Sequence, residues 1–324
     1  MKFMKKFILL AIFAALLAGC AGAAAPEPAN IRVAALRGPT ALGLFHLMYQ
    51  YEQGNAGNIY EFELLGAPVE VPPLLVTGAA DVAVVPGNLA SILYNQTDGA
   101  VQALAIVTLG VLHVVDTTGE IQSVADLEGR TIFITGQGAT PEFALNYVLT
   151  KNGLTPNVDV MIEFRAEPPE IAALLEAGQA EVALLPEPFV SAALAQNPNL
   201  NRALDLSEEW DRVQPDYGLI MSVAVARREF IENNRDALAV FMEEYAASID
   251  FMTSNVDEGA QLAVDFGLIP ALPIAQSALP RTHMVFLTGE EMRLNLLGFY
   301  AMLYNESPAS IGGELPEEDF FFIP

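Results

Sequence analysis

The sequence contains one stretch that is written twice at a spacing of 100 residues. LLVTGAADVAVVPGN, which begins at Leu74, aligns without a gap with LLEAGQAEVALLPEP, which begins at Leu174. The register extends upstream, because Gly38, Thr40, Glu63, Pro68 and Glu70 match Gly138, Thr140, Glu163, Pro168 and Glu170. A repeat of this kind means that one supersecondary unit is used twice. The chain is therefore predicted to form two lobes of similar build.

Each copy of the repeat alternates strands with helices. Apolar runs between turn residues predict strands at 31–36, 60–65 and 81–85, and again at 131–135, 160–165 and 181–185. Amphipathic patterns predict helices at 41–53 and 141–152, with Thr40 and Thr140 as N-caps. Further helices begin at Pro68 and Pro168 and end at Gly78 and Gly178. This alternation predicts an α/β fold with mainly parallel sheets flanked by helices, in which ligands bind beyond the strands' carboxyl ends.

The chain after residue 219 follows a different pattern. A strand is predicted at 219–226, a long helix at 228–254, and further helices at 257–266, 270–279 and 289–304. The tail, PEEDFFFIP, is expected to lie on the surface with its aromatic side chains docked.

The first twenty residues are typical of an export signal. Lys2, Lys5 and Lys6 precede an apolar run at 7–17, which is too short to span a membrane. The run ends in Leu-Ala-Gly-Cys20, which resembles the bacterial lipobox. That resemblance implies a signal peptide at 1–19, lipidation of Cys20 and anchoring to the outer face of the cytoplasmic membrane. Residues 20–29 are predicted to be a tether. The alternative is a plain secretory peptide with an incidental cysteine.

Cysteine content and charge narrow the classes of protein further. Cys20 is the only cysteine, so no disulfide forms within the chain and the fold depends on its core. With 52% apolar residues the chain can bury a large core. The net charge is −25, and removal of the three signal lysines makes it −28. Such a chain is repelled by nucleic acid and by anionic lipid surfaces, so nucleic acid is not expected as a partner.

Three stretches carry a resemblance to a known family. SVADLEGRTIFITGQGATPEFALNYVLTKNGL, from Ser123, resembles the second-lobe entry of ABC-transporter solute-binding proteins that bind nitrate, sulfonates, taurine and thiamine precursors. ALLEAGQAEVALLPEPFVSAA resembles a later strand and loop of the same family, and RVAALRGPTALGL resembles its first strand and loop. The resemblance covers roughly residues 31–320.

The resemblance implies a periplasmic-binding-protein-like fold of type II, with two α/β lobes and two hinge crossings near 109–111 and 217–219. Lobe 1 would comprise 30–109 plus 220–324, and lobe 2 would comprise 110–219. It also implies an exported, monomeric binder that passes a small polar solute to an ABC permease and its ATPase. The solute classes are sulfonates, nitrate-like anions, amino acids and pyrimidine or vitamin precursors. The alternative function is a lipoprotein sensor that reuses the fold without transport.

The candidate ligand contacts are loops at the carboxyl ends of the predicted strands. They comprise Arg37, Gly38, Pro39, Thr40, Ala41, Pro86, Gly87, Asn88, Gly136, Gly138, Ala139, Thr140, Glu187 and Phe189, with Pro68, Glu70, Thr108, Gly110 and Ser222 around them. Ordinary capping by the threonines and core packing of Phe189 are the structural alternatives. Arg37 and the helix N-termini favour an anion, whereas Glu70 and Glu187 favour a cation or a hydrogen-bonding heterocycle. The ligand's charge stays open at this stage.

An enzyme is not expected. There is no G-x-S-x-G elbow and no P-loop, and the glycine-rich run at 136–141 ends in proline, which breaks the dinucleotide fingerprint. His46, His113 and His283 lack the spacing of metal ligands, and His46 and His113 are interpreted as structural. No cofactor and no metal are therefore predicted.

Overall fold

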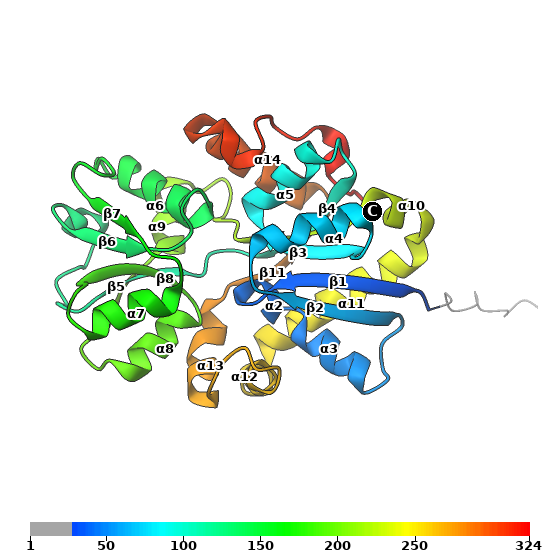
Figure 1. Ribbon diagram of the computed structural model, residues 1–324, viewed down its shortest axis with the longest axis horizontal. Helices are drawn as coiled ribbons and strands as arrows, with labels where there is room; N and C mark the ends of the chain where they lie inside the picture. The colour runs from blue at the N-terminus through cyan, green and yellow to red at the C-terminus, as the bar shows by residue number, and fades with distance from the viewer. Residues whose placement is uncertain (1–27) are drawn as a thin grey trace, which may run out of the picture.

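The computed structural model describes residues 28–324, which form two α/β lobes (Figure 1). The larger lobe is built on a six-stranded sheet in the order β11-β4-β10-β3-β1-β2, and the smaller lobe on a five-stranded sheet in the order β7-β6-β8-β5-β9. The predicted signal peptide, Cys20 and most of the predicted tether lie outside the described residues. The predicted fold class, two helix-flanked sheets, is confirmed.

The larger sheet comprises β1 (Asn30–Leu36), β2 (Ile59–Leu65), β3 (Val82–Pro86), β4 (Val101–Thr108), β10 (Ser222–Arg227) and β11 (Met284–Leu287). β1 pairs in parallel with β2 and β3. β10 runs antiparallel to both of its neighbours, β3 and β4. A strand from late in the chain therefore lies in the middle of the sheet.

The smaller sheet comprises β5 (Leu112–Asp116), β6 (Thr131–Ile134), β7 (Met161–Phe164), β8 (Val182–Pro186) and β9 (Asn201–Asp205). β6 pairs in parallel with β7 and β8, as β1 does with β2 and β3. β5 is antiparallel to β8 and β9, as β10 is to β3 and β4. The repeat in the sequence thus corresponds to the same strand arrangement in each lobe.

Helices cover both faces of both sheets. In the larger lobe they are α2 (Pro39–Leu42), α3 (Phe45–Glu52), α4 (Val71–Thr77), α5 (Gly87–Gln96), α10 (Arg228–Asn233), α11 (Arg235–Ser254), α12 (Val256–Asp265), α13 (Leu272–Ala278) and α14 (Gly289–Glu306). In the smaller lobe they are α6 (Thr140–Lys151), α7 (Pro168–Glu176), α8 (Phe189–Gln196) and α9 (Leu206–Val213). Short 3-10 turns lie at 68–70, 124–127, 279–281, 308–311 and 318–320. Within residues 28–324 no helix has both the length and the apolarity to cross a membrane.

Two predicted helices are interrupted. The helix predicted at 41–53 is split into α2 and α3, because the chain around Gly43 passes close to α11. A Cβ at Gly43 would lie 2.8 Å from Ile249 Cγ1, and the Ser248 hydroxyl donates to the Gly43 carbonyl and accepts from Leu47 N–H. The helix predicted at 228–254 is likewise divided at Asn234, whose amide donates to the Phe230 carbonyl.

The two predicted N-caps are wrong. Gly38 caps α2 and Ala139 caps α6, while Thr40 and Thr140 lie inside the first turns and make no capping bond. In α2 the first residue is Pro39, where the missing N–H costs nothing, so this helix begins before the position that a Thr40 cap would require. In α6, Thr140 is itself the first helical residue and Pro141 follows it in the first turn.

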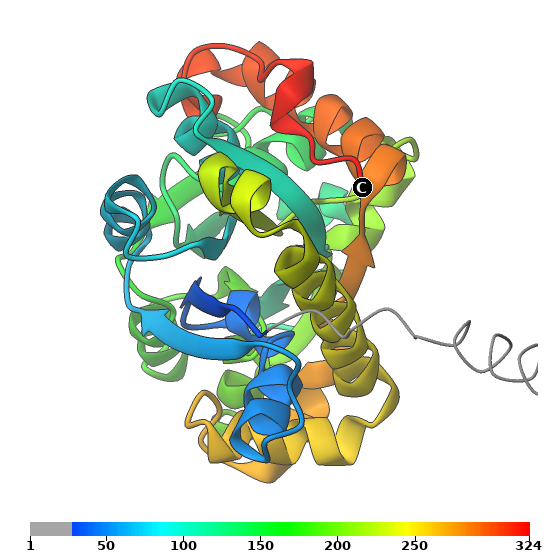
Figure 2. The same cartoon turned by 90° about the vertical axis from the view of Figure 1, so that its right-hand side faces the viewer.

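The C-terminal segment completes the larger lobe. Figure 2 shows it in red, running over this lobe to the C-terminus. Phe320 and Phe321 are buried, and Phe322 N–H donates to the Ala103 carbonyl at the start of β4. The prediction that the tail's aromatic side chains dock is thus confirmed for Phe320 and Phe321, which join the same core cluster as α5 and α14.

The chain passes between the sheets twice, at 109–111 and again after α9. At the first crossing, Leu109 N–H donates to the His283 carbonyl of the larger lobe at 3.1 Å. At the second, the only tryptophan, Trp210, is fully buried and its Nε1 donates to the Tyr217 carbonyl at 2.9 Å. Its ring also packs against Phe299 of α14, with centroids 6.4 Å apart. The core is therefore continuous across the joint between the lobes.

Candidate functional site: the contact between the lobes

Strand register brings several of the predicted residues to one edge of the larger sheet. Ser222, the first residue of β10, is paired with Pro86 at the end of β3 and with Thr108 at the end of β4. Asn88 follows two residues after Pro86, in the first turn of α5. These side chains are all nearly buried except for the partly exposed proline. The edge is the one at which β1, β3 and β4 have their carboxyl ends.

The loops of the two repeats meet across the lobes. The hydroxyl of Thr140, the first residue of α6, donates to Asn88 Oδ1 at 3.4 Å. The exposed fractions are 1% for Thr140 and 5% for Asn88. A second contact joins Ser191 of α8 to Ser277 of α13, with their hydroxyl oxygens 3.1 Å apart. The two lobes are therefore in direct contact at two places in this structure.

Helix N-termini follow the strands on both sides of this contact. α5 begins directly after β3, and α6 follows β6 through a glycine-rich loop. The first N–H groups of a helix have no partner within it and carry partial positive charge, which favours anions. Gly136 and Gly138 have φ values of 81° and 71°, so the loop before α6 depends on residues without a Cβ.

The charged residues of the site differ in whether another group of the protein already pairs with them. Arg37 is exposed at the end of β1 and forms no ion pair with any residue of 28–324. Glu187 is fully buried, and its carboxylate is engaged by Arg202 Nη1 and by the N–H and hydroxyl of Ser191. The carboxylate of Glu70 accepts a hydrogen bond from Ala67 N–H at 2.7 Å. This bond caps the 3-10 turn at 68–70. Both predicted acidic contacts are thus occupied within the protein.

The remaining predicted residues lie around this edge in different roles. Ala41 is a residue of α2 that packs into the buried core, whereas Pro39, Ala139 and Phe189 are partly exposed and Pro68 is exposed. Gly38 has a φ of 128°, which residues with a Cβ rarely adopt. A Cβ at Gly87 would lie 3.0 Å from the Ile220 carbonyl. At Gly110 a Cβ would lie 1.6 Å from Ser207 Oγ.

Sequence reasoning missed the segment that holds Asn88. Asn88 Nδ2 donates to the Ser310 carbonyl at 3.2 Å, and Ser91 and Asn95 of the same helix donate to the Ile311 carbonyl at 2.9 Å each. A stripe of polar residues at positions i, i+3 and i+7 of an otherwise apolar helix is the signal that marks such a contact.

His113 lies two residues beyond the first crossing and is buried, with neither ring nitrogen hydrogen-bonded. Its Nδ1 is 3.7 Å from Asp205 Oδ2. The pKa of His113 is lowered to about 4, mainly because the ring is buried; the charge of Asp205 opposes this shift, and the positive charges of Arg202 and Arg281 add to it. The imidazole is therefore neutral at physiological pH, as expected for a structural histidine.

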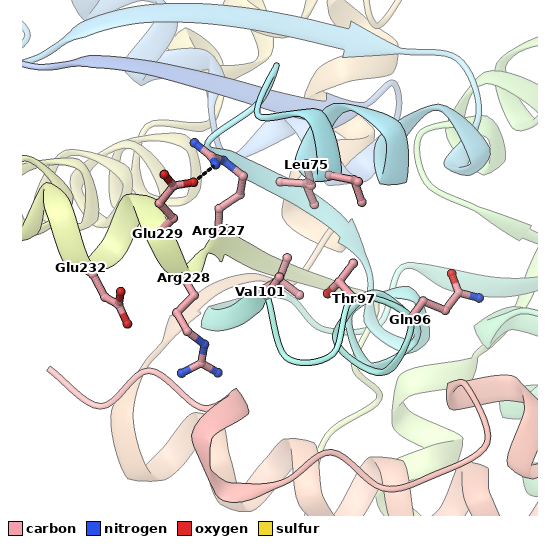
Figure 3. A pocket seen from close by; sticks show the side chains of 10 residues that line it. Leu75, Gln96, Thr97, Val101, Arg227, Arg228, Glu229 and Glu232 are labelled. Carbon is pink, nitrogen blue, oxygen red and sulfur yellow. Dashed lines mark hydrogen bonds and ion pairs between the residues drawn. The ribbon is translucent and has the colours of Figure 1, made fainter.

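Four hollows on the surface do not include the Asn88–Thr140 contact, and each is lined by one lobe only. The hollow in Figure 3, of about 480 Å³, lies at the opposite end of β10 from Ser222. Its arginines are already paired: Arg227 with Asp81 at 3.0 Å and with Glu229 at 2.9 Å, and Arg228 with Asp319 at 2.9 Å. These guanidinium groups are occupied by the lobe's own acids rather than open to an anion.

No group of three potential metal-ligating side chains occurs in the described part of the chain. The hydroxyls, amide and helix N-termini at the cleft instead suit recognition of a ligand by hydrogen bonds.

Comparisons with known proteins agree with this geometry. The family model described as "ABC transporter, phosphonate, periplasmic substrate-binding protein" matches residues 66–274. No curated protein matches the sequence significantly. An ABC transporter structure from Parabacteroides distasonis is 23% identical with a TM-score of 0.76, covering 92% of this chain and 99% of its own.

Two further structures share the fold. The periplasmic aliphatic sulphonate-binding protein SsuA from Escherichia coli is 17% identical with a TM-score of 0.71, covering 92% of this chain and 93% of its own. The periplasmic nitrate-binding protein NrtA from Synechocystis is 16% identical with a TM-score of 0.55, covering 74% of this chain and 66% of its own. Since the family model spans more than half of the chain, this protein belongs to the phosphonate-type periplasmic substrate-binding proteins of ABC transporters, which are transport components rather than enzymes.

Proposed function

We propose that the protein captures a small organic oxoanion of the phosphonate or sulfonate type in the cleft and delivers it to an ABC permease. The observation that supports this proposal is that the positive charge of the site is unpaired among the described residues, whereas its negative charges are engaged within the protein. Arg37 has no ion pair within residues 28–324, whereas Glu187 and Glu70 are engaged by the protein itself. The N-termini of α5 and α6 add partial positive charge on the two sides of the Asn88–Thr140 contact.

Closure of the lobes would couple binding to delivery. We propose lobe 1 as 30–109 with 220–324 and lobe 2 as 110–219, turning about the two crossings. A ligand that contacts both lobes favours the closed state, and a shift from 1:99 to 99:1 takes ~5.5 kcal/mol of differential binding. Lipidation of Cys20 would hold the binder near its permease and raise its effective concentration there.

The names of related proteins support the same ligand class. The matching family model is described by phosphonate, and one structural neighbour is named for aliphatic sulphonate. Both groups are tetrahedral oxoanions, for which helix N-termini and arginine are suitable partners.

The test is calorimetric titration of the protein from Cys20 onward. Methylphosphonate and ethanesulfonate are the probes, and ethanolamine is the cationic control. We expect saturable binding of an oxoanion and none of the amine. Arg37→Gln is expected to weaken binding about tenfold, since a charge-assisted hydrogen bond contributes roughly 1.5 kcal/mol. Arg235→Gln is the matched control, because Arg235 is also exposed and without an ion pair in the described chain but lies on α11. Binding of the amine alone would refute the proposal.

A further inference from the structure

The helices that follow β3 and β8 carry a serine at the same place in the repeat. Ser91 and Ser191 match at the spacing of 100 residues, and both are buried. The Ser91 hydroxyl donates to the Ile311 carbonyl at 2.9 Å, which is a bond within the larger lobe. The Ser191 hydroxyl of α8 instead lies 3.1 Å from the Ser277 hydroxyl of α13, and these two helices belong to different lobes (Figure 1). The second copy of the repeat therefore uses this serine to join the lobes.

The neighbours of Ser191 decide which of the two hydroxyls donates. A serine hydroxyl has one hydrogen, and the carboxylate of Glu187, which only accepts, lies 3.0 Å away at Oε1. That carboxylate is fully buried and is paired with Arg202, whose Nη2 also donates to the Ser191 hydroxyl at 3.3 Å. The one hydrogen of Ser191 is thus committed to Glu187. Ser277 therefore donates to Ser191 across the joint between the lobes.

The acceptor is prepared entirely within the smaller lobe. Glu187, Ser191 and Arg202 bond to one another without a residue of the larger lobe. The donor, Ser277, occupies an exposed position of α13, where water can replace Ser191 if the lobes separate. The bond between the two serines consequently contributes only while the lobes are in contact.

We infer that Ser191 and Ser277 form a serine latch, which holds the two lobes in contact in the ligand-free protein. The latch lowers the differential binding free energy that a ligand has to supply for closure. One hydrogen bond of this kind shifts an equilibrium about fivefold, which corresponds to about 1 kcal/mol. The inference concerns the ligand-free protein and goes beyond the proposed function, since it requires no particular ligand.

The distance between the lobes tests the latch directly. Cys20 is the only cysteine, so Cys20→Ser with Ala195→Cys and Glu258→Cys places one spin label at an exposed site of α8 and one at an exposed site of α12. Dipolar electron paramagnetic resonance on the protein from residue 20 onward, without ligand, then gives the ratio of short to long distances. We expect a short-distance population, and we expect Ser277→Ala to lower the ratio about fivefold. Only long distances, or an unchanged ratio in Ser277→Ala, would overturn the inference.

The repeat supplies the matched control. Ser91→Ala removes the equivalent hydrogen bond inside the larger lobe and is expected to leave the ratio unchanged. Ser191→Ala combined with Ser277→Ala is expected to lower the ratio no further than the larger single effect, because both changes remove the same bond. A fall of similar size in Ser91→Ala, or additive effects in the double variant, would overturn the latch. Failure of the protein to bind an oxoanion would refute the proposed function and leave this inference standing.

Discussion

Substitution of Gly110 by alanine tests the packing of the first crossing. A Cβ at this position would lie 1.6 Å from Ser207 Oγ and 2.7 Å from Ser207 Cβ. Gly110 is not among the glycines with positive φ, so the cost is steric rather than a strained backbone. Ser207 is buried in the first turn of α9, and its hydroxyl has no hydrogen-bond partner among the described residues. The crossing and α9 must therefore separate to admit one methyl group.

The expected loss of stability follows from the steric overlap between the new methyl group and Ser207. Overpacking a well-packed site costs about 1–3 kcal/mol, and two contacts below 3.0 Å place Gly110→Ala toward the upper part of that range. We expect the free energy of unfolding to fall by about 2 kcal/mol. Ser207→Gly removes both clashing atoms and leaves its Cα 3.4 Å away, which is an ordinary contact. The double variant is therefore expected to regain about half of the loss, because glycine in a helix itself costs about 1 kcal/mol.

Urea unfolding followed by tryptophan fluorescence is the assay. Trp210 is the only tryptophan, is fully buried, and lies one turn of α9 beyond Ser207. Gly66→Ala is the control, since a Cβ there would meet no atom closer than 3.7 Å. Additive effects of Gly110→Ala and Ser207→Gly, or an unchanged midpoint for Gly110→Ala, would show that the steric reasoning is wrong.

Three further predictions concern buried groups. His113 has a pKa of about 4 when folded against 6.5 when unfolded, so stability is expected to fall by up to about 3 kcal/mol as pH drops from 6.5 to 4. Thermal melts of His113→Gln should show a smaller loss over this range, and an identical pH dependence would contradict the assignment. Glu187→Gln leaves Arg202 without its buried partner and should cost about 3–5 kcal/mol in urea unfolding; a cost below 1 kcal/mol would count against the pair. Phe320→Ala should cost about 3–5 kcal/mol and lower the melting temperature, whereas an unchanged melt would mean that the tail is not part of the core.

The repeated unit was predictable because its signals are local. Strands expected at 81–85 and 181–185 are found as β3 and β8 one residue later, since short apolar runs between turn residues define them. β4, β5, β9 and β11 were not predicted. β11 has only four residues and pairs with β4 through Met284 and Leu287 alone, so its existence depends on a strand far away in the sequence.

The candidate site was predictable in outline but not in its pairing. Parallel strands share one edge for their carboxyl ends, which is why Pro86 and Thr108 lie at the same edge. Ser222 joins them because the antiparallel strand β10 begins at that edge. The order of the strands does not predict which acidic side chains remain without a partner inside the protein. Glu187 forms an ion pair with Arg202 of the next strand along the chain, and Asn88 donates a hydrogen bond to the carbonyl of Ser310 near the C-terminus. Such partners are chosen by tertiary packing, which leaves no pattern in the local sequence.

The central position of β10 has a consequence for the order in which the chain folds. β3 and β4 do not touch in the larger sheet until residues 222–227 lie between them, whereas every strand of the smaller sheet comes from 112–205. Contacts between distant segments form late, because the loop must first be closed. Members of this family work outside the cytoplasm. If the chain is exported N-terminus first, residues 30–108 stay unfolded at the membrane surface until residues 222–227 have also been exported. We therefore expect the smaller lobe to fold first and to bring the two halves of the larger lobe together.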